Sequence, residues 1–186
     1  MNPAFLLGIK EAFADARMTL DKFHLVALLT KAVDETRKSE SRSKRRLTGT
    51  RWIWLKNPAA LSVRRQEELK TFFLEESCCQ TARAYGFKLS FQGLFGYKSR
   101  TARRLLEGWL GAALISELPH IVQVAKTLSK MKEMVLNWFE TRISSGILEG
   151  FPSVLQATKN KARGYKDPDN LIAMSYLLHG KLDALT

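Results

Sequence analysis

Apolar residues recur at every third or fourth position through most of the chain, which is the spacing of one face of an α-helix. The stripe is clearest from about residue 22 to residue 38, where it consists of Phe23, Val26, Leu29 and Val33. The same spacing predicts that the rest of the chain is mainly helical. The further helices are expected at about 3–15, 62–75, 99–115, 119–140, 152–163 and 168–178.

Two short segments have the composition of β-strands. Residues 16–20, ARMTL, precede the clearest helix, and residues 50–58, TRWIWLKNP, place Trp, Ile and Trp in sequence between Gly49 and an Asn-Pro pair. Strands with an intervening helix favour parallel pairing, so we expect an α/β fold that is mostly helical. Two parallel strands are too few for an independent sheet, which indicates that the chain is part of something larger.

Residues 84–99 follow neither pattern. Their sequence, AYGFKLSFQGLFGYKS, is interrupted by glycines and rich in aromatic residues, so we expect irregular structure there. The aromatic side chains could pack as a small satellite core or stack on nucleic-acid bases, and packing is the more common role.

Charge adds an expectation about partners. The chain has 30 Lys and Arg against 18 Asp and Glu, a net charge of +12 and a pI near 9.9. Such a surplus suggests a polyanionic partner, most often nucleic acid or an anionic membrane surface, while a soluble surface that is merely basic is the other interpretation. Basic residues concentrate at 37–51, 98–104 and 159–166.

Several classes of protein are disfavoured. No run of about 18 apolar residues is present, so we expect no membrane span, and the N-terminus lacks the features of a signal peptide. The two cysteines, Cys78 and Cys79, are neighbours that cannot staple a fold, and no Cys/His spacing suggests zinc. These features fit a reducing, cytoplasmic setting.

Two acidic residues occupy positions that could carry chemistry. Asp21 follows the candidate strand at 16–20, where sites gather in α/β sheets, but an Asp at such a position is more often the N-cap of the next helix. Glu149 lies between Gly146 and Gly150, which could let the backbone bring its carboxylate close to a ligand. It could equally be an ordinary glutamate in the first turn of a helix.

Basic side chains are candidates for contacts to a phosphate backbone. Residues 156–166, QATKNKARGYK, contain no acid, and Lys159 and Arg163 are four positions apart, on one helical face. A solvent-exposed face is the commoner outcome for such a stripe. The DNA contacts that we expect are Arg51, Lys56, Lys159, Lys161, Arg163 and Lys166.

Four blocks of the sequence together resemble a known family. They are MNPAFLLGIKEAFADARMTLDKFHLVALLTKAVDETR, GTRWIWLKNPAAL, LPHIVQVAKTL and RISSGILEGFPSVLQATKNKARGYKDPDN. The resemblance as a whole covers residue 1 to about residue 182. In these blocks the chain is similar to bacterial insertion-sequence transposases of the DDE type, in the ISL-three group. The D-x-F-H and L-E-G pieces are the most distinctive.

The resemblance implies an RNase H-like catalytic domain that acts on DNA. In that family three carboxylates bind two divalent metal ions, usually magnesium and alternatively manganese, for cleavage and strand transfer. The second family aspartate maps onto Asp21, at the end of the fourth strand of the RNase H sheet, and the family glutamate maps onto Glu149. The whole chain, 1–186, would be a partial domain with a helical insertion at about 59–140.

The chain also departs from the family. The first aspartate would stand one position before Met1, so the metal triad is incomplete and metal binding should be weak. The first three strands and the upstream DNA-binding region are absent, and Ser145 and Pro152 stand where the family often has Asn. We therefore expect a truncated transposase that is inactive alone.

Two questions about partners and function stay open. An uncovered edge of the strand at 16–20 would favour self-association or association with a full-length transposase. The competing function is a non-catalytic module, which binds DNA through its basic surface or serves as a helical interaction domain.

Overall fold

The computed structural model of the chain describes residues 8, 11–74 and 79–143 and, nearer the C-terminus, 146–162, 164 and 167–179. It divides into two compact units, residues 1–143 and 144–186. The helix expected at 3–15 lies largely outside the described residues. None of the helices within the described ranges is long and apolar enough to cross a membrane.

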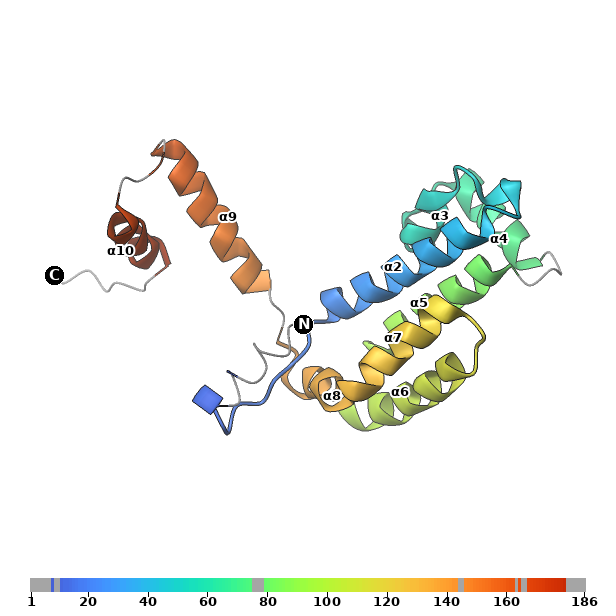
Figure 1. Ribbon diagram of the computed structural model, residues 1–186, viewed down its shortest axis with the longest axis horizontal. Coiled ribbons are helices and arrows are strands. Elements are labelled where there is room, and N and C mark those ends of the chain that lie inside the picture. The colour runs from blue at the N-terminus through green and yellow to red at the C-terminus, as the bar shows by residue number, and fades with distance from the viewer. Residues whose placement is uncertain are drawn as a thin grey trace. The chain divides into compact units, whose positions relative to one another are not determined.

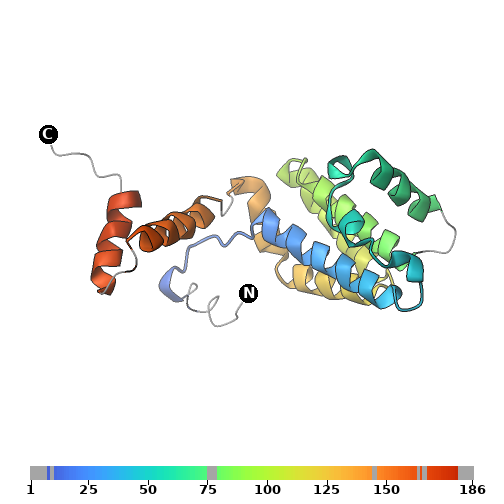
Figure 2. The same ribbon diagram turned by 90° about the horizontal axis from the view of Figure 1, so that it is seen from above.

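The first unit is a helical bundle with α2 near its middle (Figures 1 and 2). Its elements are α2 (Lys22–Glu40), η1 (Arg45–Leu47), α3 (Arg51–Leu55), η2 (Pro58–Ala60), α4 (Val63–Leu74), α5 (Gln80–Leu94), α6 (Ser99–Leu114), α7 (Pro119–Lys130) and α8 (Lys132–Thr141). α2 packs against α5 and α7, α6 packs against α5, α7 and α8, and the short α3 contacts α2, α4 and α5. The helices predicted at 22–38, 62–75 and 99–115 are confirmed.

Every buried apolar side chain that the structure describes belongs to this bundle. Part of its centre is aromatic, since the Trp54 ring lies edge-on to Tyr85 at 5.7 Å between ring centroids. A second aromatic group joins Phe91 to Trp109 at 5.0 Å. The buried aromatic side chains of residues 84–99 thus serve packing, which was the more common of the two roles considered.

The expected α/β fold is wrong, because the described residues contain no strand and no sheet. Residues 16–20, the first predicted strand, have no regular secondary structure. The N–H of Leu20 donates to the carbonyl of Met134 at 3.1 Å, and the side-chain amide of Asn137 donates to the carbonyl of Met18 at 2.9 Å. Polar backbone groups that a neighbouring strand would satisfy are bonded to α8 instead. The argument for association through an open sheet edge at this segment therefore falls.

The second predicted strand, TRWIWLKNP, contains the helix α3 instead. A strand would direct Trp52 and Trp54 to the same face, whereas the Trp52 residue is 61% exposed and Trp54 is fully buried. The indole N–H of Trp54 donates to the hydroxyl of Thr50, four residues earlier, at 3.0 Å. The amine of Lys88 donates to the carbonyls of Trp54 and Leu55 at 3.2 and 2.8 Å, so it caps the end of α3. Burial lowers the pKa of Lys88 to about 8.

Two further expectations about helices need correction. The segment at 84–99 is not irregular, because α5 runs through it as far as Leu94. Tyr85 and Phe91 are fully buried on α5, and this burial outweighs the cost of about 1 kcal/mol for each glycine inside a helix. The helix expected at 119–140 is divided at Met131 into α7 and α8.

The second unit contains α9 (Gly146–Lys161) and α10 (Pro168–His179), which contact each other. The helix predicted at 168–178 is confirmed, but α9 begins before its predicted start, so Pro152 lies in the second turn of α9 rather than in the first. No side chain that the structure describes in this unit is buried. The large apolar side chains that α10 exposes include Ile172, Tyr176, Leu177 and Leu178.

Candidate functional site

Asp21 is the N-cap of α2. Its backbone is extended, with φ −64° and ψ 134°, and its carboxylate oxygen Oδ1 accepts a hydrogen bond from the N–H of Phe23 at 2.7 Å. A carboxylate at this position satisfies an N–H at the start of the helix and lies favourably at the positive end of the helix dipole. The capping role that the sequence favoured is confirmed, and a catalytic role stays a prediction.

Glu149 lies in the first turn of α9, in the other unit. The structure does not describe the Glu149 side chain, and Arg163 and Lys166 lie outside the described residues. The position in a first turn matches the ordinary structural interpretation of this glutamate. The convergence of Asp21 and Glu149 at one site stays a prediction.

The described residues do not by themselves form a site for a divalent metal ion. Mg²⁺ prefers an octahedral shell of oxygen ligands. Within the described ranges, no three Asp, Glu, His or Cys side chains gather at one point. Asp21 already has one oxygen engaged with the N–H of Phe23. The described residues alone therefore do not supply all the ligands of the magnesium or manganese pair that the resemblance implies.

Four of the expected DNA contacts are described, and all four residues are exposed. Lys159 and Lys161 lie in the last turn of α9. Lys56 follows the end of α3, where its carbonyl accepts a hydrogen bond from the Tyr85 hydroxyl at 2.7 Å. Arg51 is the first residue of α3. Exposed cations next to backbone that is held in place are suited to phosphate contacts.

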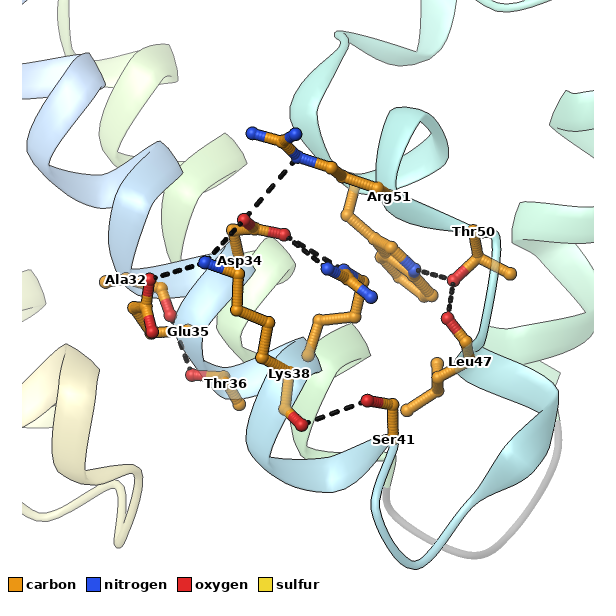
Figure 3. Close-up of polar contacts among 11 residues, drawn as sticks. Ala32, Asp34, Glu35, Thr36, Lys38, Ser41, Leu47, Thr50 and Arg51 are labelled. Carbon is orange, nitrogen blue, oxygen red and sulfur yellow. Dashed lines mark hydrogen bonds and ion pairs between the residues drawn. The ribbon is translucent and has the colours of Figure 1, made fainter.

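A buried carboxylate that the sequence did not single out forms an ion pair with Arg51 (Figure 3). Asp34 of α2 is 5% exposed, and its Oδ1 accepts hydrogen bonds from Nε and Nη2 of Arg37 at 3.0 and 2.8 Å. Its Oδ2 lies 3.3 Å from the Lys38 amine and 3.5 Å from Nε of Arg51. Burial raises the pKa of Asp34, but the hydrogen bonds and charges of Arg37 and Lys38 outweigh burial and lower the pKa. Asp34 is therefore ionised at neutral pH, and its ion pair with Arg51 joins α2 to the first residue of α3.

A second buried carboxylate, Glu40, joins the end of α2 to the start of α5. Its oxygens accept hydrogen bonds from the N–H groups of Gln80 and Thr81 at 3.0 and 2.8 Å and from the Thr81 hydroxyl at 2.7 Å. The thiol of Cys79 donates to it at 3.3 Å, and the Lys44 amine lies 2.9 Å away. Burial raises the pKa of Glu40, but the hydrogen bonds from Lys44, Thr81 and Gln80 outweigh burial and lower the pKa to about 2.

The basic run at 37–51 is therefore not a uniform surface for DNA. Arg37 is buried against Asp34, and Lys44 pairs with Glu40. A sequence signal for both pairs exists, because partners three or four positions apart meet on a helix or at its end. The bonds from Glu40 to α5 had no such signal, since their donors lie about forty positions along the chain.

A groove of about 550 Å³ lies between α2 and α3. Its charged lining residues are Lys31, Asp34, Glu35, Lys38 and Arg51. The amine of Lys38 lies within 3.3 Å of one of these acids and 2.8 Å of the other, so it partly neutralises both. Phe23, two residues after Asp21, also lines the groove. The groove therefore extends along α2 from the neighbourhood of a candidate carboxylate to a candidate DNA contact.

Comparison with known proteins gives consistent results. Residues 1–175 match the sequence model of a protein family that is described as transposase, of the DDE type and the ISL3 group. The transposases for insertion sequence element IS1557 from two Mycobacterium tuberculosis strains, CDC 1551 and H37Rv, are each 24% identical to the chain over 197 residues. The alignment covers 91% of this chain and 44% of each relative, so the chain spans less than half the length of these curated relatives. No solved structure matches.

Proposed function

Because the chain belongs to the ISL3 family of DDE-type transposases, we propose that it acts on the DNA of an insertion sequence, as part of a transposase catalytic domain. The family match over residues 1–175 is the observation that carries this proposal. The reaction in question is DNA cleavage and strand transfer, which moves the element from one DNA site to another.

In this proposal Asp21 and Glu149 are two of the three carboxylates that hold divalent metal ions, magnesium or manganese. Such ions, when bound, activate an attacking hydroxyl and neutralise charge on the phosphate. The resemblance assigns no residue of this sequence to the third carboxylate, and every carboxylate both binds the ions and offsets their charge. We therefore expect the chain to be inactive in strand transfer when it is alone.

DNA binding in this proposal rests on exposed cations. Arg51, Lys56, Lys159 and Lys161 are exposed, and the chain carries a net charge of +12. Arg163 and Lys166 extend the same basic stretch in the sequence. Contacts of this kind go to phosphates, so they set affinity and position rather than sequence preference.

The test combines two measurements on the full chain with the terminal-repeat DNA of the insertion sequence. Binding titrations at several salt concentrations should show that the binding constant falls steeply as salt rises. Replacing Lys159 and Lys161 together by Gln should reduce that slope by about two. A matched control replaces two exposed lysines of α7, Lys126 and Lys130, and should change the slope less.

A strand-transfer assay with magnesium or manganese completes the test, and the chain alone should give no product. Robust strand transfer would overturn the expected inactivity. Binding that is insensitive to salt would contradict the basic surface as the DNA contact. A chain that binds no DNA at all would favour the competing function, a helical interaction domain, over the one proposed.

A further inference from the structure

We propose that Trp52 and Arg51 of α3 together bind one unpaired nucleotide of the DNA, with the base stacked on the indole ring and a phosphate on the guanidinium. This inference rests on the proposed function, because it takes DNA as the polyanion. It adds a defined position on α3 and a preference for single-stranded over fully paired DNA.

Trp52 differs from the other tryptophans in its exposure. Trp54, Trp109 and Trp138 are at most 6% exposed, whereas Trp52 is 61% exposed. Single exposed apolar residues are common on proteins, so exposure alone identifies no site. What distinguishes Trp52 is that the guanidinium carbon of Arg51 lies 5.3 Å from the centre of its ring. An exposed indole beside a cation offers a stacking face and phosphate donors together.

The guanidinium of Arg51 lies beside the carboxylate of Asp34. Its Nε faces Oδ2 of Asp34 at 3.5 Å, and Figure 3 shows the rest of the guanidinium directed away from that carboxylate. Among the described residues, the terminal nitrogens of Arg51 have no hydrogen-bond partner, and the Arg51 side chain is 55% exposed. These nitrogens form a planar fork that matches the geometry of a phosphate.

Asp34 can position Arg51 because it is itself fixed. Arg37 holds its Oδ1 with two hydrogen bonds, at 3.0 and 2.8 Å, and both side chains of this pair are buried. The pKa of Asp34 is lowered, so the carboxylate keeps its charge at neutral pH. A carboxylate that is buried, ionised and held by two hydrogen bonds is a rigid support for an exposed arginine.

The groove between α2 and α3 gives a DNA strand a path away from this position. It is lined along α2 from Phe23 to Lys38, a length of about 22 Å at 1.5 Å per residue. Lys38 bridges the two acids of the groove, so Lys31 is the lining cation better placed for a second phosphate. A strand held at Arg51 would thus lead along α2 toward Asp21.

Stacking on Trp52 selects an unpaired base. Inside a duplex both faces of a base are covered by its neighbours, so an indole can stack only where the strand is open or a base has left the helix. Phosphate contacts from Arg51 and Lys31 would serve paired and unpaired DNA equally. The preference for open DNA therefore comes from Trp52.

The test uses tryptophan fluorescence of the full chain, because Trp52 is the exposed tryptophan of the four. The three probes are an oligothymidine of about ten nucleotides, a strand of equal length without bases, and a blunt duplex of equal length. About ten nucleotides lies within the usual site size of a single domain that binds single-stranded DNA. The oligothymidine should quench the emission, and the strand without bases should bind more weakly and without quenching. The quenching should disappear in Trp52→Phe, because a phenylalanine ring lacks the indole emission and the other three tryptophans are buried.

Substitutions separate stacking from phosphate binding. Trp52→Ala should weaken oligothymidine binding about 5- to 100-fold and change duplex binding little. Phe73→Ala, which removes another exposed aromatic ring of the first unit, is the matched control and should change neither. Asp34→Asn should weaken binding of the strand without bases, to which Trp52 contributes nothing, and Asp34→Glu should restore part of it. Arg51→Lys, which keeps the charge but loses the planar fork of nitrogens, should weaken the binding of all three probes.

The outcomes distinguish this inference from the proposed function. If Trp52→Ala leaves oligothymidine binding unchanged while the chain still binds the duplex, the inference fails and the proposed function stands. Quenching that persists in Trp52→Phe would also overturn it. A chain that binds none of the three probes would overturn both.

Discussion

In the first unit, residues 1–143, α2 lies against α5 and α7, and the bundle encloses large side chains such as Trp54 and Phe91. In the second unit, residues 144–186, α9 and α10 contact each other, yet none of the side chains described there is buried. α10 leaves Tyr176 70% exposed. The same chain therefore contains one unit with a core and one in which the described side chains form no core.

This difference shows where the stability of the chain resides. Burial of apolar surface contributes roughly 25 cal/mol per Å² to stability. Among the described residues, the fully buried apolar side chains all lie in the first unit. Helices as short as α9 and α10 are marginal in water unless they pack against something. The two candidate carboxylates thus stand on elements of unequal stability, Asp21 on the bundle and Glu149 on α9.

The largest difference between the units should appear when one aromatic side chain is removed from each. Trp54→Ala should lower the free energy of unfolding by about 3–5 kcal/mol, because it empties a fully buried site. Tyr176→Ala should change it by less than about 0.5 kcal/mol, because that side chain is mostly exposed. Urea unfolding followed by circular dichroism measures both values. Losses of similar size in the two variants would contradict the contrast between the units.

A smaller effect should come from acid, through the Glu40 carboxylate of the first unit. Its folded-state pKa of about 2 lies below the ordinary value of 4.5, so its contribution is complete above about pH 4.5 and is lost as the pH falls toward 2. The contribution is about 3 kcal/mol, at about 1.4 kcal/mol per pKa unit. Urea unfolding at a series of pH values should show that the free energy of unfolding falls between about pH 4.5 and pH 2. This fall should be smaller in Glu40→Gln.

The control for this measurement is Glu68→Gln on α4. Glu68 pairs with Arg65 at 3.0 Å, but the Arg65 side chain is 45% exposed, and such surface pairs contribute about 1 kcal/mol or less. Glu68→Gln should therefore leave the acid sensitivity largely unchanged. If Glu40→Gln behaved in the same way, the carboxylate would not be what joins α2 to α5 energetically.

The smallest effect should come from removing the second unit altogether. A chain that ends at Ile143 loses no side chain that is described as buried, so its free energy of unfolding should stay within about 0.5 kcal/mol of the intact chain. The same urea titration measures it. A larger loss would show that α9 or α10 supports the bundle and would remove the contrast between the units.

Sequence reasoning succeeded where one helical face carries the apolar residues, as on α2 and α6, because a sustained stripe has few alternative explanations. It failed at α3, because Trp-Ile-Trp has the alternation of a strand but is too short to exclude a helix. What decides between them are the hydrogen bonds of Thr50 and Lys88 to Trp54, and the Lys88 bond comes from residues 34 positions apart. Periodicity in a short window contains no information about such partners.

The candidate site was also predictable only in part. The cap at Asp21 follows from its local position before α2, and the structure confirms it. Exposure of Arg51, Lys56, Lys159 and Lys161 agrees with the expectation for basic side chains. The support that Asp34 gives to Arg51 was not predicted, because it depends on how α3 packs against α2. A charge run in a sequence does not tell which of its members turn inward.

The carboxylate of Glu40 has a consequence for how the bundle opens. The first amides of a helix have no partner within that helix, and helix ends ordinarily fray. At the start of α5, the amides of Gln80 and Thr81 are held by a side chain from the end of α2. The first turn of α5 can therefore loosen only by giving up its bonds to Glu40, which leaves a buried carboxylate without two of its donors. We therefore expect the opening of this turn to be coupled to the last turn of α2, a segment remote in the chain.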